Sequence, residues 1–434
     1  MALFHFICTE CGKTYREHDV ELTCPVCEKL QVTGSFARGV LHVELESFPK
    51  VIAKRGLPIN HPEVLASHWP VKSAADVPSY PVGDTPLLPA PGIRKHLNLK
   101  NFWLKDDTRN PSGSTKDRAS LLVAIKAKEY RKEIIVTAST GNAATALAAV
   151  TAGMGLKSVV FVPATAPRAK LVQMMNYGAK VIPVRGTYDD AFELSIAAAK
   201  KFNWYNRNTA LNPFTIEGKK TLGIEIIENL TRESKAPRGA REYLVPDVVI
   251  IPVGDGVILA GIAKGFSDLK KAGLISRVPR LLAVQPEMSS VIVRSLELNQ
   301  YSKKKAKNDI LIAKPSPANS VADSLNVAMP RNALLAVKEI LSSGGDGVIV
   351  DDEAILDAIQ TLSRLSGVFP EPAGATAFAG LLSAIEQKLV TKNETIVLVV
   401  TGTGLKDITA AAEKLAMPEP ISPTMESLTL DLLY

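Results

Sequence analysis

The chain has 434 residues, of which 46% are hydrophobic and 22% are charged, an ordinary composition for a globular protein. Taking roughly 150 residues per domain as a guide, this length allows two packed domains and an appendage. No apolar run reaches the roughly 18 residues that a membrane helix needs. The net charge is +7, and the basic residues are spread along the chain except for the run Lys303-Lys304-Lys305. We interpret this run as a solvated loop.

The N-terminal stretch, Met1 to Phe6, has no basic segment and leads directly into a pair of cysteines. It does not have the pattern of a secretory signal, and we expect a cytoplasmic protein that binds neither membranes nor nucleic acid. A basic protein of this kind is suited to small anionic ligands.

All four cysteines lie in the first 27 residues, as two Cys-x-x-Cys units separated by twelve residues. Each unit can point two thiolates in one direction, and two units supply the four sulfurs of a tetrahedral zinc site. Two chance pairs, or two disulfides, are the alternative interpretation. We predict a structural zinc ribbon over residues 1–38, because so small a domain is marginal without metal. The predicted zinc ligands are Cys8, Cys11, Cys24 and Cys27.

Residues 39–80 contain several prolines, and we interpret them as a connecting arm.

The segment 110–118 reads Asn-Pro-Ser-Gly-Ser-Thr-Lys-Asp-Arg and leads into an apolar run. Ser114 or Thr115 is a plausible helix N-cap. Lys116 then falls in the first helical turn, where a cation is unfavourable. A helix N-terminus lowers the pKa of an amine and favours its neutral, nucleophilic form. Position alone does not establish such a role, because solvated lysines are common.

Six short apolar runs have the length and composition of buried strands, and segments rich in Ala, Leu, Lys and Glu separate them. Continuous apolar strands that alternate with helices indicate an α/β fold with covered parallel sheets. In such sheets, ligands bind beyond the carboxyl ends of the strands. The predicted strands are Ile134–Val136, Val159–Val162, Val181–Val184, Val248–Ile251, Leu281–Val284 and Ile396–Val400.

Three of these strands end in glycine-containing loops that precede a helix, at residues 137–142, 252–256 and 401–404. A strand, a glycine turn and a helix present free backbone N–H groups and the positive helix end to an anion. One such loop is more often plain turn chemistry, but three in one chain indicate a shared site for a phosphate and a carboxylate. The helices are expected at residues 143–152, near Val257 and near Leu405.

The segment 111–118 resembles the cofactor-lysine motif of threonine synthase and its relatives among the fold type II pyridoxal-phosphate (PLP) enzymes, and the loop 138–142 resembles their Asn-bearing loop. The resemblance covers at least residues 80–410 and implies a homodimer with PLP between two α/β domains. The larger domain would comprise residues 81–108 and 206–420, and the smaller, mobile one residues 109–205. Three further segments match the family in order, at residues 212–221, 371–375 and 401–407.

The resemblance also implies a role for each site residue. Lys116 would bind PLP as a Schiff base and move the α proton of the substrate. Asn142 would hydrogen-bond the 3′ oxygen of the cofactor, while Ser139 and Thr140 would hold the substrate carboxylate. Thr401 would face the pyridine nitrogen, and a hydroxyl there leaves this nitrogen unprotonated, which suits elimination and replacement more than transamination. Backbone amides of one loop would hold the cofactor phosphate: Gly254, Asp255, Gly256, Val257 and Ile258.

Several positions depart from the threonine synthase pattern for binding a substrate phosphate. Ser and Arg are expected around the Asn-Pro segment and Asn in the glycine loop, where this chain has Ala210, Thr215 and Asp255. A phosphate leaving group would lose contacts that are typically worth about 1.5–3 kcal/mol each, and it would meet a carboxylate. The basic residues that could compensate are Arg207, Lys219 and Lys220.

These residues predict a PLP-dependent lyase that carries out elimination or replacement on a small amino acid. The first hypothesis is threonine synthase, which converts O-phosphohomoserine to threonine. The second is a serine or threonine ammonia-lyase or a β-replacement enzyme similar to cysteate synthase, since the chemistry at Lys116 is shared. The third is a catalytically silent zinc-ribbon binding protein, against which the retained lysine and the intact loops argue.

Overall fold

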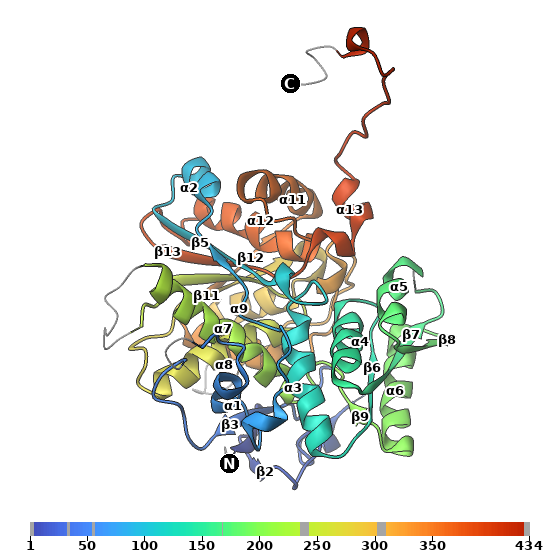
Figure 1. Cartoon of the computed structure of the whole chain (residues 1–434). Coiled ribbons are helices and arrows are strands. Elements are labelled where there is room, and N and C mark those ends of the chain that lie inside the picture. The colour runs from blue at the N-terminus through green and yellow to red at the C-terminus, as the bar shows by residue number, and fades with distance from the viewer. Residues whose placement is uncertain are drawn as a thin grey trace.

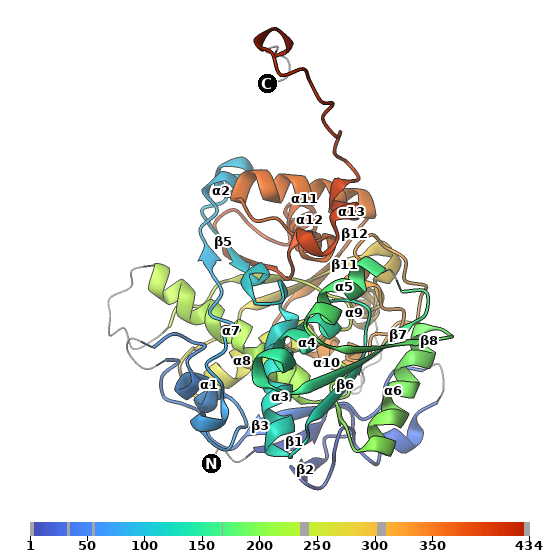
Figure 2. The same ribbon diagram turned by 45° about the vertical axis from the view of Figure 1, so that its right-hand side comes forward.

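The computed structural model describes residues 4–32, 35–53, 57–166, 168–234, 243–301 and 310–428. The lysine run at 303–305 lies outside these residues. Three sheets organise the described chain (Figures 1 and 2). None of the described helices is long and apolar enough to cross a membrane.

The N-terminal sheet has three antiparallel strands in the order β2-β1-β3 and lies at the base of the molecule in Figure 1. Alternate residues of β3 are buried, as expected for a strand with one covered face. Strand β3 falls within the segment 39–80, so the first part of this segment belongs to the ribbon sheet. The strands are β1 (Phe4–Cys8), β2 (Thr14–Arg16) and β3 (Leu41–Leu45).

The largest sheet has six strands in the order β12-β11-β10-β13-β5-β4, all parallel except for the antiparallel pair β4 and β5. Alternate residues of its strands enter two separate hydrophobic cores. Helices α8, α9 and α10 contribute to one core, and α2, α11 and α12 to the other, so both faces are covered. The strands are β4 (Leu87–Leu88), β5 (Asn101–Asp106), β10 (Val248–Pro252), β11 (Arg280–Pro286), β12 (Asp346–Val350) and β13 (Thr395–Val400).

The third sheet has four parallel strands in the order β8-β7-β6-β9. Helix α6 packs on one face of this sheet, and α4 packs on the other with α5 against it. The strands are β6 (Ile134–Ala138), β7 (Lys157–Pro163), β8 (Lys180–Val184) and β9 (Tyr205–Asn206), and the helices are α4 (Asn142–Met154), α5 (Arg168–Asn176) and α6 (Tyr188–Phe202).

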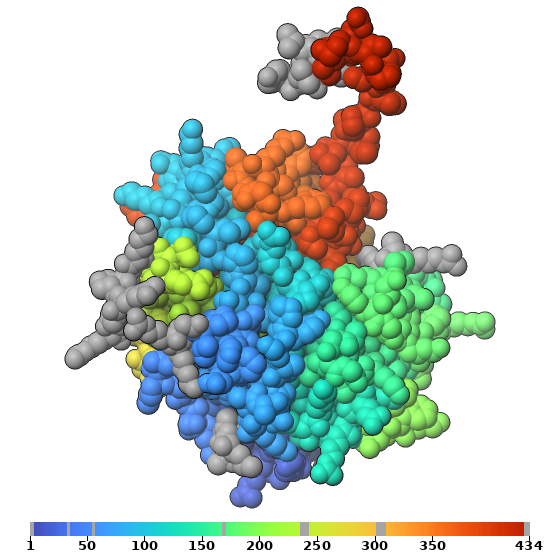
Figure 3. Space-filling model, in the orientation of Figure 1, coloured from blue at the N-terminus to red at the C-terminus, as the bar shows by residue number. Residues whose placement is uncertain are grey.

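Helix α3 joins the two parallel sheets, because it packs against α4 on one side and α7 on the other. Helix α7 in turn packs along α8. After α13 the chain projects away from the body (Figure 3). The remaining helices are α1 (Pro62–His68), α2 (Pro91–Leu97), α3 (Lys116–Glu129), α7 (Phe214–Glu233), α8 (Val257–Lys271), α9 (Val291–Tyr301), α10 (Ala333–Ser342), α11 (Asp352–Ser366), α12 (Pro372–Glu386) and α13 (Ile408–Ala412).

The predicted α/β fold is confirmed, and each of the six predicted strands is present in a parallel sheet. The helices expected after the first two glycine loops are also present, as α4 and α8. The helix expected near Leu405 differs: Gly404–Lys406 forms a single 3-10 turn, and α13 begins at Ile408. The reason is Asp407, whose side chain caps α13 by accepting a hydrogen bond from the backbone of Ala410. The domain boundaries stay a prediction.

Candidate active site

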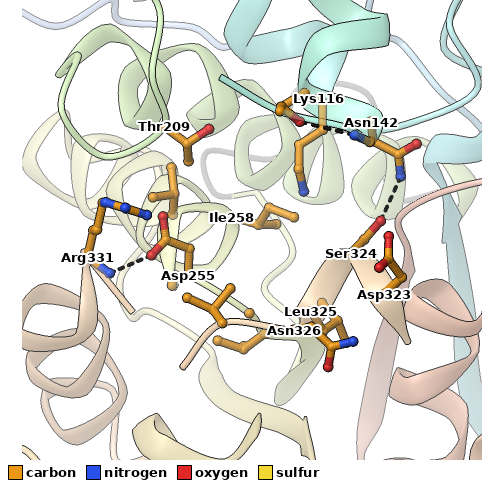
Figure 4. A pocket seen from close by; sticks show the side chains of 18 of the residues that line it. Lys116, Asn142, Thr209, Asp255, Ile258, Asp323, Ser324, Leu325, Asn326 and Arg331 are labelled. Atoms are coloured by element: carbon orange, nitrogen blue, oxygen red, sulfur yellow. Dashed lines mark hydrogen bonds between the residues drawn. The ribbon is translucent and has the colours of Figure 1, made fainter. Parts of the chain in front are cut away.

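A cavity of about 400 Å³ lies at the carboxyl ends of β6 and β10 (Figure 4). Two of the predicted glycine loops line it from opposite sides, and α3 supplies Lys116. This is where an α/β sheet is expected to bind a ligand. The lining residues are Lys116, 138–143, Tyr188, Asp189, Phe192, Thr209, Lys219, 252–259, 323–329 and Arg331.

Lys116 is the first residue of α3, as predicted. Thr115 occupies the N-cap position but makes no side-chain cap, so the expected hydroxyl cap is absent. The third glycine loop fixes the backbone here instead. The amide of Thr115 donates to the carbonyl of Thr401 at 2.9 Å, and Ser114 forms a bridge with Gly402. Through these contacts Thr401 positions the lysine, although it is not itself among the residues that line the cavity.

The side chain of Lys116 extends into the cavity, with Asn142 and Ser324 on one side and Asp255 on the other (Figure 4). Burial lowers the pKa of Lys116 to about 8, and the positive charge of Arg207 acts in the same direction. The direction of the shift agrees with the prediction, and burial is its largest cause. An amine with this pKa is neutral far more often than an exposed lysine at neutral pH, as a nucleophile or a base must be.

The first glycine loop leads into the N-terminus of α4, and this loop lines the same cavity as Lys116. Gly141 is the N-cap and makes no side-chain cap. The hydroxyl of Ser139 accepts a hydrogen bond from the amide of Gly141 at 3.2 Å, which shapes the loop. The first backbone N–H groups of a helix have no partner within the helix, so this end of the cavity is suited to a carboxylate.

Asn142, the first residue of α4, directly contacts a buried carboxylate that does not itself line the cavity. Its side-chain amide donates to both oxygens of Glu371, each at 2.9 Å, and approaches the hydroxyl of Ser324 at 3.3 Å. Glu371 is the N-cap residue of α12, and burial raises the pKa of its carboxyl group. A Cβ atom at Gly402 would lie 2.4 Å from this carboxylate, which explains the glycine. Glu371 was not predicted as a site residue, although it lies in one of the family segments.

The N-terminus of α8 lines the opposite end of the cavity. Its N-cap Gly256 has a φ of 85° and no side-chain cap. A Cβ atom here would lie 2.9 Å from the Cβ atom of Ala336, so only glycine fits this turn. The residues 254–258 therefore offer uncapped backbone amides at a positive helix end, which fits a phosphate group.

The side chain of Asp255 is turned towards Arg331. Its carboxylate accepts the backbone N–H of Arg331 at 2.5 Å (Figure 4). The guanidinium of Arg331 lies 4.0 Å from the ring centroid of Phe192 and 3.9 Å from the carboxylate of Asp189, both on α6. Burial raises the pKa of Asp255 to about 6, against the opposing charge of Arg331. Arg331 was missed because no sequence pattern indicates a contact across 76 positions.

The three basic residues proposed as compensating cations have different surroundings. Lys219 lines the cavity. Lys220 points elsewhere, since it pairs with Asp268 at 2.9 Å and with Glu217. Arg207 is buried beside the cavity and donates to the hydroxyl of Thr209 at 2.7 Å.

Two of the three positions that differ from the threonine synthase pattern do not line the cavity. The hydroxyl of Thr215 is turned to the carbonyl of Asn212 at 2.7 Å. Ala210 is buried with a φ of 66° and packs against Val257 and Leu335. Of the three positions that differ from the threonine synthase pattern, only Asp255 lines the cavity.

The four cysteines form one cluster, in which every sulfur lies within 4.8 Å of the others and none is in a disulfide. The Sγ atoms of Cys8 and Cys27 are 3.8 Å apart, and those of Cys11 and Cys24 are 3.7 Å apart. A tetrahedral zinc ion with Zn–S bonds of about 2.3 Å requires sulfurs about 3.8 Å apart. The four side chains therefore fit a zinc ion.

Comparisons with known proteins give a consistent result. Residues 78–402 match the family described as pyridoxal-phosphate dependent enzyme. The chain is 35% identical over 415 residues to threonine synthase of Methanocaldococcus jannaschii, covering 95% of each chain, and 30% identical over 431 residues to that of Methanosarcina acetivorans, covering 98% of each.

Solved structures of low identity show the same fold. Threonine deaminase isoform 2 of Solanum lycopersicum superposes with a TM-score of 0.61 at 23% identity, over 78% of this chain and 92% of that one. Diaminopropionate ammonia lyase of Escherichia coli superposes with a TM-score of 0.62 at 18% identity, over 78% and 88%. The fold is that of the type II PLP enzymes, as the sequence motifs implied.

Proposed function

The chain belongs to the family of pyridoxal-phosphate-dependent enzymes, and from this premise we propose that it carries out elimination or replacement on a small amino acid, with Lys116 binding the cofactor. The observation that carries this proposal is the position of Lys116 in one cavity between two uncapped helix N-termini, those of α4 and α8. When bound, PLP supplies an electron sink that makes the α C–H bond of an amino acid acidic.

Each residue of the cavity has a part in this proposal. Lys116, with its lowered pKa, accepts the α proton of the substrate and returns a proton later. Ser139 and Thr140 orient the substrate carboxylate at the N-terminus of α4. Asn142, which Glu371 holds in place, would hydrogen-bond the 3′ oxygen of the cofactor. Thr401 does not line the cavity and holds the backbone just before Lys116, so its contact with the ring nitrogen remains an expectation from the resemblance. The backbone amides of residues 254–258 bind the cofactor phosphate.

Among possible substrates, we favour O-phosphohomoserine, with threonine and inorganic phosphate as products. The phosphate group leaves from Cγ, and water then supplies the hydroxyl group at Cβ. Two relatives that align over nearly the whole chain are threonine synthases. Arg331 supports the choice, because it is an arginine that lines the cavity, whereas the family arginine expected at position 215 is absent from this chain.

A second candidate is the elimination of water from serine or threonine, with release of a 2-oxoacid and ammonia. The observation that favours it is Asp255, a buried carboxyl group in the cavity with a pKa raised to about 6. In its protonated form this group could donate a proton to a leaving hydroxyl group, whereas in its charged form it would repel a phosphate.

The four-cysteine cluster is proposed to bind one structural zinc ion, because two of its sulfur–sulfur distances match a tetrahedral site and all four sulfurs lie within 4.8 Å of one another. Four sulfur ligands leave no open position for a substrate. The homodimer and the cytoplasmic location remain expectations from the resemblance and the sequence.

Product analysis distinguishes the two reactions. The purified protein with PLP is incubated separately with O-phosphohomoserine, serine and threonine, and phosphate, threonine and 2-oxoacid are measured. Release of phosphate with an equal amount of threonine is the expected result. Release of 2-oxoacid from serine or threonine, without reaction of O-phosphohomoserine, would support the second candidate and contradict the first.

A further inference from the structure

Lys219 is a fully buried lysine that has no carboxylate partner within the described part of the chain. The four other lysines that are almost fully buried in this part of the chain are paired with carboxylates, whereas Lys116 is only partly buried. Lys105 contacts Glu225 at 2.7 Å, and Lys126 contacts Glu129 at 2.6 Å. Lys220 and Lys264 share Asp268. A buried charge without a partner is unfavourable, so Lys219 requires an explanation.

The only hydrogen bond that Lys219 makes among the described residues leads back to its own helix. Its Nζ atom donates to the carbonyl of Thr215, four residues earlier in α7, at 3.1 Å. Burial lowers the pKa of Lys219 well below its ordinary value, and the positive charges of Arg207 and Lys116 act in the same direction. The nearby carboxylate of Asp255 opposes this effect, but it already accepts a hydrogen bond from Arg331. Lys219 therefore has no carboxylate of its own among the described residues.

Lys219 lies beside the helix whose N-terminus fits a phosphate group. A Cβ atom built on Gly261, one turn into α8, would lie 2.6 Å from the Cβ atom of Lys219. The absence of a side chain at Gly261 thus lets the stem of Lys219 pack directly against α8. The same lysine and residues 254–258 line one cavity, so a bound phosphate and the ammonium group would share it.

We propose that Lys219 is the counter-cation of the cofactor phosphate. The inference rests on the proposed function, because it requires PLP in this cavity. It also accounts for Asp255, a residue that should repel a phosphate. The backbone N–H of Arg331 holds the carboxylate of Asp255, and Lys219 then balances the charge of the phosphate itself. A charge-assisted contact is roughly twice as strong as a neutral hydrogen bond, so removing it should measurably weaken cofactor binding.

The test compares PLP with pyridoxal, which lacks the phosphate, in the holoenzyme stripped of cofactor and then reconstituted. Dissociation constants are measured from the visible absorption of the bound cofactor, for the natural protein and for Lys219→Met and Lys219→Arg. We expect Lys219→Met to bind PLP on the order of 10- to 100-fold more weakly and to bind pyridoxal unchanged. Lys219→Arg, which keeps the charge, should recover most of the preference for PLP.

Two results would overturn the inference. Equal losses for PLP and pyridoxal would mean that Lys219 only supports the fold of the cavity. An unchanged preference for PLP, with a raised KM for O-phosphohomoserine, would assign the lysine to the substrate phosphate instead. Failure of the natural protein to bind PLP at all would contradict the proposed function itself, and this outcome is visible before any variant is made.

Discussion

The side-chain amide of Asn142 donates to both carboxylate oxygens of Glu371, each at 2.9 Å. The two residues are 229 positions apart in the chain and stand at the N-termini of α4 and α12. The contact thus crosses from the four-stranded sheet to the six-stranded one beside Lys116. It fixes the orientation of an amide that we propose to contact the cofactor ring.

Replacement of Glu371 by Gln should lower kcat by about 10- to 100-fold, because the new amide offers an N–H group where Asn142 needs an acceptor. Thermal stability should change little, since the side chain keeps its shape. Activity assays and thermal unfolding would measure both effects. Glu353→Gln is the matched control, because Glu353 lies exposed on α11. Full activity of Glu371→Gln would show that the contact with Asn142 has no catalytic consequence.

The charge of Asp255 should make the binding of a phosphate-bearing substrate depend on pH. Its pKa is raised to about 6, so the group is neutral below pH 6 and negative above it. Affinity for O-phosphohomoserine should therefore fall relative to Asp255→Asn as the pH rises through 6, by roughly tenfold at pH 8. Ionisation of the substrate phosphate occurs with both proteins and cancels in the ratio. If the ratio between the affinities of the natural protein and of Asp255→Asn does not change with pH, Asp255 does not titrate near pH 6.

The same shift has a consequence for stability. A carboxyl group with a raised pKa in the folded protein binds its proton more tightly there than in the unfolded chain. Asp255 therefore destabilises the fold increasingly as the pH rises from about 4 through 6. Asp255→Asn should unfold at a higher temperature than the natural protein at pH 8, and this difference should disappear near pH 4.

The cysteine cluster should contain one zinc ion per chain. Removal of zinc with a chelator should lower the temperature of unfolding of the ribbon and expose four thiols to a thiol reagent. Cofactor affinity should fall as well, because Val40 of the ribbon packs in one core with Val257 and Ala260 of α8. A metal-free protein with immediately reactive thiols, or with two disulfides, would contradict the zinc assignment.

A buried ionic network supports the helix that carries Lys116. Arg118 contacts Asp107 at 2.7 Å and Glu225 at 2.5 Å, and all three side chains are buried. Although burial alone would raise it, the charges of Arg118 and Lys105 lower the pKa of Glu225 to about 2. Its contribution to stability is therefore complete above its unfolded pKa of 4.5 and is lost as the pH falls towards 2.

Replacement of Arg118 by Met should cost about 3–5 kcal/mol, because it leaves buried carboxylates without their partner. The exposed Arg109, which lies 3.5 Å from Asp106, is the matched control, and Arg109→Met should cost at most about 1 kcal/mol. Thermal unfolding of both variants at neutral pH would measure the difference. Equal, small effects would mean that the network around Arg118 contributes little to stability.

Much of the fold could be predicted because buried parallel strands have a simple pattern. The runs at 134–136, 248–251 and 396–400 are apolar at every position, as strands covered on both faces require. Strands β5 and β12 were missed because each has an apolar run of only three residues, next to polar residues or glycine. Lys105 and Asp106 in β5 are buried in ionic and hydrogen-bonded contacts that apolar patterning does not detect.

The candidate site was predictable where it depends on local sequence. The loops that contain Asn142 and Gly256 could be recognised as strand–turn–helix units, and the structure brings them to one cavity with Lys116. The placement of Arg331 and Glu371 at the site could not be predicted, because it depends on contacts between distant segments. The same is true of the lack of a carboxylate partner for Lys219. The sequence alone does not distinguish Lys219 from Lys220. The packing of α7 against α8 turns Lys219 towards the cavity and places Lys220 against Asp268.

The central claim is that Lys116 binds the cofactor, and chemical trapping tests it most directly. The protein with bound PLP is treated with borohydride, which reduces a Schiff base to a stable bond, and the labelled peptide is identified by mass spectrometry. The label is expected on Lys116, with no label in Lys116→Ala. Label on another lysine of the same cavity, above all Lys219, would contradict the assignment.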